Sequence, residues 1–249
     1  MEILIRAIKV IFFAVTYVLF SYIKVKRYEK TADNGYNKDL EENVHKFAKK
    51  FGTEIIRKTG SSVSVSGLEN IPQDQAVLFV GNHQSNFDIP LLVGYLGRPV
   101  GFVAKIEINK IPILSRWMKL LHCVLMDRSN RRQSLQAIKD GINNLKNGYS
   151  MVIFPEGTRS KGKGMVPFKQ GSLKLGTAAE VPIVPFVITG THDLMETSES
   201  VFGKANVSLK VLEPIKFSEY KDLDNQELVT IIQSRINSEL PVVYKMLSE

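Results

Sequence analysis

A histidine and an aspartate stand five positions apart directly after a strongly apolar run. The stretch GNHQSNFD occupies residues 81–88 and follows the run AVLFV at residues 76–80. The imidazole of His83 can act as a general base near neutral pH, and the carboxylate of Asp88 can accept a hydrogen bond from the other ring nitrogen. This spacing is also typical of a helix cap or a buried hydrogen-bonded pair, so taken alone it leaves both interpretations open.

The nucleophile that would complete a hydrolytic triad is missing from the sequence. There is no Gly-x-Ser-x-Gly segment, and the single cysteine, Cys123, lies in an apolar run, where a thiol behaves as a small hydrophobic group. A base without a nucleophile of its own must activate a group on the substrate. A substrate hydroxyl fits, because a histidine–aspartate pair can deprotonate it for attack on an acyl carbon without a covalent intermediate.

A glycine-rich basic loop follows a second apolar run, MVIF. The loop PEGTRSKGKG covers residues 155–164, and its composition is typical of loops that bind phosphate through backbone amides and a bidentate arginine, here Arg159. Residues 157–163 match the first seven positions of a Walker A loop, but Gly164 stands where the magnesium-binding Ser or Thr is required. With Pro167 close behind, the loop does not predict a nucleotide hydrolase.

Four segments of the chain resemble the conserved blocks of the glycerolipid acyltransferases, and in particular those of bacterial 1-acyl-sn-glycerol-3-phosphate acyltransferases, also called lysophosphatidic acid acyltransferases. The blocks stand in the family's order and extend over about residues 63–191: NHQSNFD at 82–88, GFVAKIEINKIP at 101–112, FPEGTRS at 154–160 and VPIVPF at 181–186. Each block alone is modest evidence. Their joint occurrence indicates the family.

The resemblance implies a function for these residues. His83 would be the general base and Asp88 its partner, and the glycerol-phosphate would be held by Lys105, Glu156, Gly157, Thr158 and Arg159. His83 would deprotonate the 2-hydroxyl of lysophosphatidic acid, which attacks the thioester of acyl-CoA or acyl-ACP and yields phosphatidic acid. No metal and no cofactor is expected; acyl-CoA or the acyl carrier protein serves as cosubstrate.

Other functions remain open at this point. The acceptor could be another lysophospholipid or glycerol 3-phosphate. A membrane-associated hydrolase with a metal site is disfavoured, because the remaining histidines, His45, His122 and His192, show no ligand spacing. A noncatalytic membrane-binding module would leave both loops without a purpose, and a nucleic-acid binder would explain only the charge, since no aromatic-rich basic stretch is present.

The composition is that of an ordinary globular protein with a basic surface. The chain has 249 residues, of which 44% are hydrophobic and 23% charged, and its formal net charge is +8. The charge favours anionic partners: an acidic membrane surface, an acidic carrier protein or phosphorylated small molecules. A single cysteine excludes both an intrachain disulfide and a cysteine-based metal cluster.

The first 59 residues are predicted to form a two-helix membrane anchor. The uncharged segment 10–23 would make a helix of only about 21 Å, short of the roughly 30 Å hydrocarbon core. Basic residues flank it on both sides, so both ends are expected at one membrane face: Arg6, Lys9, Lys24, Lys26 and Arg27. Residues 38–58 form a basic amphipathic helix that would complete a monotopic anchor on the cytoplasmic face of the cell membrane.

Residues 60–249 alternate short β-rich runs with helical segments. The strand candidates are SVSVS, AVLFV, VGFVA, CVLM, MVIF, PIVPFVI and NVSLKVL, and helices are expected at 89–96, 113–122, 131–147, 170–179 and 225–245. This alternation predicts an α/β acyltransferase domain with a mostly parallel sheet flanked by helices. Because ligands gather beyond the carboxyl ends of parallel strands, the two chemistry-bearing loops are expected at one edge of the sheet.

Overall fold

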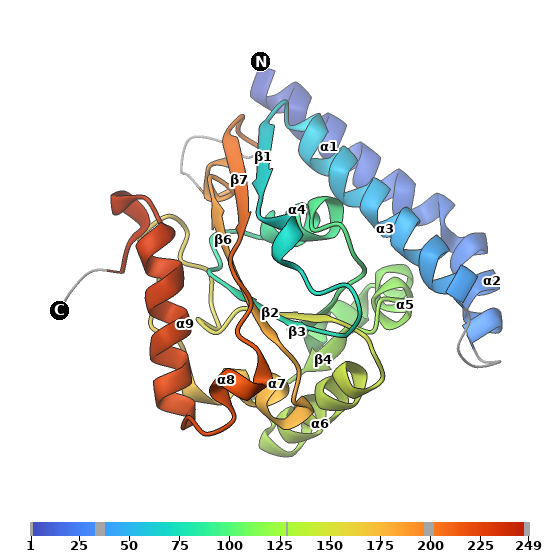
Figure 1. The fold of residues 1–249 in the computed structure, drawn as a ribbon. Coiled ribbons are helices and arrows are strands. Elements are labelled where there is room, and N and C mark those ends of the chain that lie inside the picture. Colours follow the sequence, from blue (N-terminus) through green and yellow to red (C-terminus); the bar gives the residue numbers. More distant parts are fainter. Residues whose placement is uncertain (1, 33–37, 128, 197–201, 247–249) are drawn as a thin grey trace.

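A seven-stranded sheet forms the centre of the molecule (Figure 1). The structure is a computed structural model that describes residues 2–32, 38–127, 129–196 and 202–246. All seven predicted strands are present, in the spatial order β1-β7-β6-β2-β5-β3-β4. Their bounds are β1 Ser62–Ser66, β2 Leu78–Gly81, β3 Gly101–Lys105, β4 Val124–Met126, β5 Met151–Ile153, β6 Ile183–Thr189 and β7 Asn206–Val211. Every pairing is parallel except β6 with β7, which confirms the predicted mostly parallel sheet.

Helices cover both faces of this sheet, so its central strands are buried on both sides. Side chains of β2 alternate between two cores: Leu78 and Val80 belong to one, and Phe79 belongs to the other. The helices of the body are α4 Asp88–Tyr95, α5 Pro112–Leu120, α6 Arg131–Lys146, α7 Lys174–Ala179, α8 Phe217–Tyr220 and α9 Asn225–Glu239. Burial on both faces explains why β2 is a continuous apolar run in the sequence and not an alternating one.

The last helix is shorter than predicted. It was expected over residues 225–245, but α9 ends at Glu239, and a short 3₁₀ turn follows at Val242–Tyr244. Pro241 explains the difference, since proline has no N–H to continue the helix and disfavours helical backbone in the residue before it. The helix begins at Asn225, as predicted. Asp224 caps its first turn by accepting hydrogen bonds from the backbone N–H groups of Gln226 and Glu227.

The N-terminal region consists of α1 Glu2–Phe20, α2 Tyr22–Ala32 and α3 Lys38–Lys58. The amphipathic helix at 38–58 exists, but its apolar side chains, including Val44 and Ile56, are buried against the rest of the protein. Gly52 of α3 and Gly94 of α4 allow a very close approach, since a Cβ at Gly52 would lie 2.7 Å from the backbone nitrogen of Gly94. The helix that was predicted to complete the membrane anchor therefore has protein, not lipid, against its apolar side.

Among the described residues, α1 alone is long and apolar enough to cross a membrane. It lies along α3 on the outside of the body (Figure 1). The chain bends between α1 and α2 at Ser21, whose hydroxyl accepts a hydrogen bond of 2.7 Å from the indole nitrogen of Trp117. The membrane candidate is thus one helix rather than a pair. The predicted domain boundary at residue 59 falls between α3 and β1.

Candidate active site

The two predicted loops leave the same edge of the sheet. Strands β2 and β5 are neighbours in parallel register, with Val80 opposite Ile153, so the loops that follow them begin side by side. Backbone hydrogen bonds then hold the loops together: the N–H of Ser160 donates to the carbonyl of His83 at 2.7 Å, and that of Lys161 to the carbonyl of Gln84 at 3.2 Å. His83 and the glycine-rich loop of residues 155–164 therefore belong to one site.

His83 and Asp88 form a hydrogen-bonded pair. The distance from Nδ1 of His83 to Oδ2 of Asp88 is 2.7 Å, and the histidine side chain is 17% exposed, so the ring reaches the surface. The ring stacks on Phe154 with centroids 4.0 Å apart and planes 13° apart, which holds its orientation. With Nδ1 on the carboxylate, Nε2 is the nitrogen available to accept a proton from a substrate.

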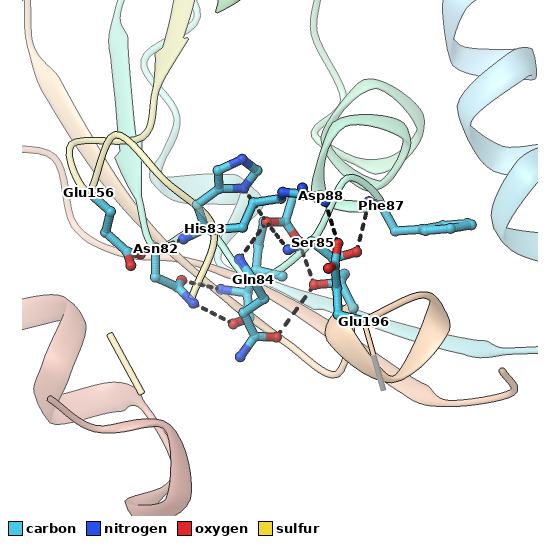
Figure 2. A network of polar contacts seen from close by, with 11 residues as sticks. Asn82, His83, Gln84, Ser85, Phe87, Asp88, Glu156 and Glu196 are labelled. Carbon is cyan, nitrogen blue, oxygen red and sulfur yellow. Dashed lines mark hydrogen bonds and ion pairs between the residues drawn. The ribbon is translucent and has the colours of Figure 1, made fainter. Parts of the chain in front are cut away.

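Asp88 is fully buried, and several donors compensate for the loss of water around its carboxylate. Oδ2 accepts from the backbone N–H groups of Gln84 at 2.7 Å and Ser85 at 3.1 Å, and Oδ1 accepts from the hydroxyl of Thr191 (Figure 2). The residue also begins α4, where the helix dipole favours negative charge. A buried carboxylate with this set of donors can orient the imidazole and stabilise its protonated form.

The buried side chain of Glu156, in the loop after β5, is hydrogen-bonded to the loop after β2. Its two carboxylate oxygens accept from the backbone N–H groups of His83 at 2.6 Å and Val166 at 2.9 Å. Burial raises the pKa of Glu156 to about 7; the two backbone hydrogen bonds act in the opposite direction, and the nearby Asp88 raises the pKa further. The contact of Glu156 with a substrate remains a prediction, whereas its position gives it a second role as the bridge between the loops.

This pKa leads to a pH-dependent prediction. Because the folded-state pKa of Glu156 is raised from 4.5 to about 7, the stability associated with its proton is fully present below pH 4.5 and is lost as the pH rises through 7. Glu156→Gln does not titrate. The free energy of unfolding of this variant relative to wild type should therefore rise between pH 5 and pH 8, by about 2.5 kcal/mol. Denaturant unfolding at several pH values measures this, with the exposed Glu213→Gln as control; a pH-independent difference would contradict it.

The glycine-rich loop of residues 155–164, which was predicted to bind phosphate, has several basic side chains in or near it. Gly157 has φ +68°, a left-handed conformation that favours glycine, and Thr158 is exposed. The Lys169 ammonium is close by, since a Cβ at Gly157 would lie 2.8 Å from its Nζ. Lys105 ends the neighbouring strand β3 and is exposed. Nη1 of Arg159 donates to Oε1 of Glu196 at 2.5 Å.

Sequence analysis missed four contributors to this site: Phe154, Lys169, Thr191 and Glu196. Phe154 stands within a block that had already been singled out, so its place before the loop was a usable signal. The predicted strand PIVPFVI ends at residue 188 and β6 ends at Thr189, so Thr191 lies two residues beyond the carboxyl end of the strand, at the same edge of the sheet. Among the residues that the structure describes, no group of three or more His, Cys, Asp or Glu side chains is placed to hold a metal.

Comparison with known proteins places the chain in a family. The family profile described as Acyltransferase matches residues 62–189, a little more than half of the chain. This protein belongs to the acyltransferase family. The match begins with β1 and ends with β6, so it contains both the His83–Asp88 pair and the glycine-rich loop of residues 155–164.

Relatives of this acyltransferase carry names that agree with one another. It is 31% identical over 230 residues to a probable 1-acyl-sn-glycerol-3-phosphate acyltransferase of Mycoplasma pneumoniae, a match that covers 87% of this chain and 84% of the relative. It is 33% identical over 192 residues to a chloroplast 1-acyl-sn-glycerol-3-phosphate acyltransferase of Arabidopsis thaliana, covering 76% of this chain and 54% of the relative. The chain therefore spans about half the length of the chloroplast relatives that it matches.

A solved structure shares the fold. The crystal structure of the 1-acyl-sn-glycerophosphate (LPA) acyltransferase PlsC from Thermotoga maritima superimposes with a TM-score of 0.82 at 30% sequence identity, covering 94% of this chain and 93% of the other. This likeness extends beyond the family profile into the N-terminal helices and the C-terminal part. It confirms the predicted fold class of a mostly parallel sheet flanked by helices.

Proposed function

We propose that this acyltransferase transfers a fatty acyl group from an acyl thioester to the 2-hydroxyl of 1-acyl-sn-glycerol-3-phosphate and so produces phosphatidic acid. One observation carries the proposal. The backbone hydrogen bonds of Ser160 and Lys161 hold the loop that contains Arg159 beside the histidine–aspartate pair, and the histidine of that pair reaches the surface. A base beside an anion-binding loop is suited to a hydroxyl on a phosphorylated substrate. The printed names of the relatives support the choice of acceptor.

The mechanism follows from the geometry of the pair. Nε2 of His83 removes the proton of the 2-hydroxyl as the oxygen attacks the thioester carbonyl, and the buried carboxylate of Asp88 stabilises the resulting imidazolium. The new C–O bond forms, the C–S bond breaks, and the imidazolium returns its proton to the leaving thiolate. Acyl-CoA and acyl-ACP present the same thioester to this chemistry. Arg159, Lys105 and the amides of residues 156–158 are proposed to hold the phosphate.

An acyl-transfer assay tests this function. The purified chain would be given lysophosphatidic acid, lysophosphatidylglycerol or glycerol 3-phosphate, each with acyl-CoA and with acyl-ACP. We expect phosphatidic acid and free thiol in equal amounts with lysophosphatidic acid. Release of free fatty acid without an acylated product would instead indicate a hydrolase.

Arg159→Ala tests the phosphate-binding role. A charge-assisted hydrogen bond contributes about 1.5–3 kcal/mol, so the KM for lysophosphatidic acid should rise by roughly 10- to 100-fold while kcat changes less. The KM for the thioester donor should stay close to that of wild type and serves as the internal control. An unchanged KM for lysophosphatidic acid would contradict the role.

We propose further that α1 binds this protein to one leaflet, at the cytoplasmic face of the cell membrane. One side of α1 packs on the body through Ala7 and Val10, and the opposite side exposes an apolar stripe: Leu4, Ile8, Ile11, Phe12, Val15 and Leu19. Basic residues occur near both ends of the apolar segment, which suits a helix lying in the interface better than one crossing the membrane. A leaflet also supplies a lipid acceptor and receives a lipid product.

Surface substitutions on α1 test membrane binding. Deleting the helix would uncover the core around Val10, whereas Phe12→Ser with Leu19→Ser changes only exposed side chains. Each side chain contributes about 1.5–3 kcal/mol when buried in lipid, so the vesicle partition coefficient should fall by more than about 100-fold. Leu135→Ser with Ile231→Ser, on exposed faces of α6 and α9, is the matched control. Equal partitioning of the two double variants would contradict the assignment.

A further inference from the structure

The side chain of Lys169 lies against the glycine-rich loop of residues 155–164. It is exposed and runs along Gly157: a Cβ at this glycine would lie 2.8 Å from Nζ, 3.1 Å from Cε and 3.4 Å from Cδ of the lysine. The backbone of Gly157 has φ +68°, a left-handed conformation that favours glycine. Because residue 157 has no side chain, the ammonium of Lys169 can lie beside the backbone of the loop.

The backbone of Lys169 is fixed to the start of this loop. Its N–H donates to the carbonyl of Pro155 at 3.1 Å, and its own carbonyl accepts from the N–H of Ser172 at 3.0 Å. The preceding residue, Phe168, is buried and donates its N–H to Oε1 of Gln233 at 2.6 Å. The lysine side chain therefore starts from a fixed backbone, which keeps its ammonium near the loop.

Lys169 and Arg159 differ in their partners. Nη1 of Arg159 donates to Oε1 of Glu196 at 2.5 Å, so a carboxylate already balances part of the charge of the arginine. Among the residues that the structure describes, no carboxylate forms an ion pair with Lys169. An anionic ligand can therefore meet the ammonium of Lys169 without first breaking an ion pair.

We propose that Lys169 binds the phosphate of the acyl acceptor, together with Arg159 and the backbone of residues 156–158. This inference rests on the proposed function. A phosphomonoester carries a charge of about −1.5 to −2 near pH 7, which is more than one cation balances. Arginine orients a phosphate through its planar fork of donors, whereas lysine contributes a compact point charge that can bind from another side.

Other roles for Lys169 would produce different kinetics. If its side chain only supported the loop, its loss would lower the thermal midpoint and kcat. If it bound the phosphates of a donor such as acyl-CoA, the KM for the thioester donor would rise. A residue that binds the phosphate of the acceptor should instead change the KM for the acceptor and leave the other two quantities near their wild-type values.

Lys169→Met separates these roles, because methionine keeps most of the unbranched stem along Gly157 and removes the charge. The KM for lysophosphatidic acid is expected to rise by roughly 5- to 30-fold, since a charge-assisted hydrogen bond is lost at a position where salt and water screen it. Lys169→Gln, which also lacks the charge, should behave alike. An unchanged KM for lysophosphatidic acid, or a rise confined to the KM for the donor, would overturn the proposal.

Lys146→Met is the matched control. Lys146 is exposed and ends α6, close to the amino end of β5 and so at the opposite edge of the sheet from the site. The variant loses the same charge from the protein as Lys169→Met does. It should keep the wild-type KM for lysophosphatidic acid, and an equal rise in both variants would indicate a general effect of net charge and overturn the proposal.

A binding measurement tests the role of Lys169 without turnover. Glycerol 3-phosphate is expected to raise the thermal midpoint of the wild-type protein more than that of Lys169→Met, whereas glycerol, which has no phosphate, should affect both alike. Equal shifts with glycerol 3-phosphate would overturn the inference. The two proposals can fail separately. Absence of acyl transfer by wild type to lysophosphatidic acid would refute the proposed function, while the thermal shifts would still decide whether Lys169 binds a phosphate.

Discussion

Replacing His83 with alanine is expected to lower kcat for acyl transfer by roughly 10³- to 10⁴-fold, near the upper end of what a general base contributes. The ring is the base in the proposed mechanism, and the pairing of Nδ1 with Asp88 leaves Nε2 to face the substrate. His192, which lies near the same loops, is buried and has its Nε2 3.1 Å from Asp193, so it is not placed to substitute. The KM for lysophosphatidic acid should change little, because the phosphate is held by other groups.

His45→Ala is the matched control for this prediction, since His45 lies on α3, away from the active edge of the sheet. It should retain kcat within about twofold, well inside the effect of a lost general base. A folded His83→Ala protein that transfers acyl groups at the wild-type rate would refute the mechanism. The thermal midpoint of each variant, measured alongside, separates loss of chemistry from loss of folding.

Asp88→Asn is expected to lower kcat by about 10²- to 10⁴-fold while leaving the fold intact. Three donors converge on Oδ2, namely the His83 ring and the amides of Gln84 and Ser85, so the asparagine oxygen should take that position. Its NH₂ group then faces Thr191, whose hydroxyl can rotate and accept. The geometry survives, but the negative charge that stabilises the imidazolium is lost.

The comparison with Asp88→Ala sharpens this prediction. Alanine would leave two buried backbone N–H groups without acceptors, at a cost of about 1–3 kcal/mol each, so its effects on rate and on folding would be mixed. Asparagine avoids that ambiguity. If Asp88→Asn kept kcat within about threefold, the carboxylate would serve the structure of the loop rather than the reaction.

Local signals in the sequence were sufficient to locate the strands and the chemistry. The apolar runs AVLFV and MVIF became the buried strands β2 and β5, and the alternating run SVSVS became β1, whose residues are exposed or only partly buried. His83, Asp88 and Arg159 were named from residue type and from their place after such runs. The assignment of Glu156 illustrates the limit of this approach. A carboxylate in a block that resembles the family's suggests substrate contact, whereas its bond to His83 depends on two loops that lie side by side.

In the N-terminal region too, a local sequence pattern predicted an element but not its contacts. The periodicity of residues 38–58 correctly predicted an amphipathic helix, but periodicity does not state what lies against the apolar side. Protein covers that side, because Gly52 and Gly94 let α3 pack closely on α4. Most of the large apolar side chains that stay exposed in the N-terminal region belong to α1.

By itself, the sequence determined the alternation of strands and helices, the place of a histidine near an aspartate, and the glycine-rich basic loop that is proposed to bind an anion. These features depend on residues within a few positions of one another. Only the tertiary structure decided that Thr191 bonds to Asp88 and that Glu196 pairs with Arg159. Both contacts join segments far apart in the chain, and they exist because β6 lies beside β2 in the sheet and brings the loop after β6 to the same edge. Strand order arises from the packing of the whole core, which no local pattern records.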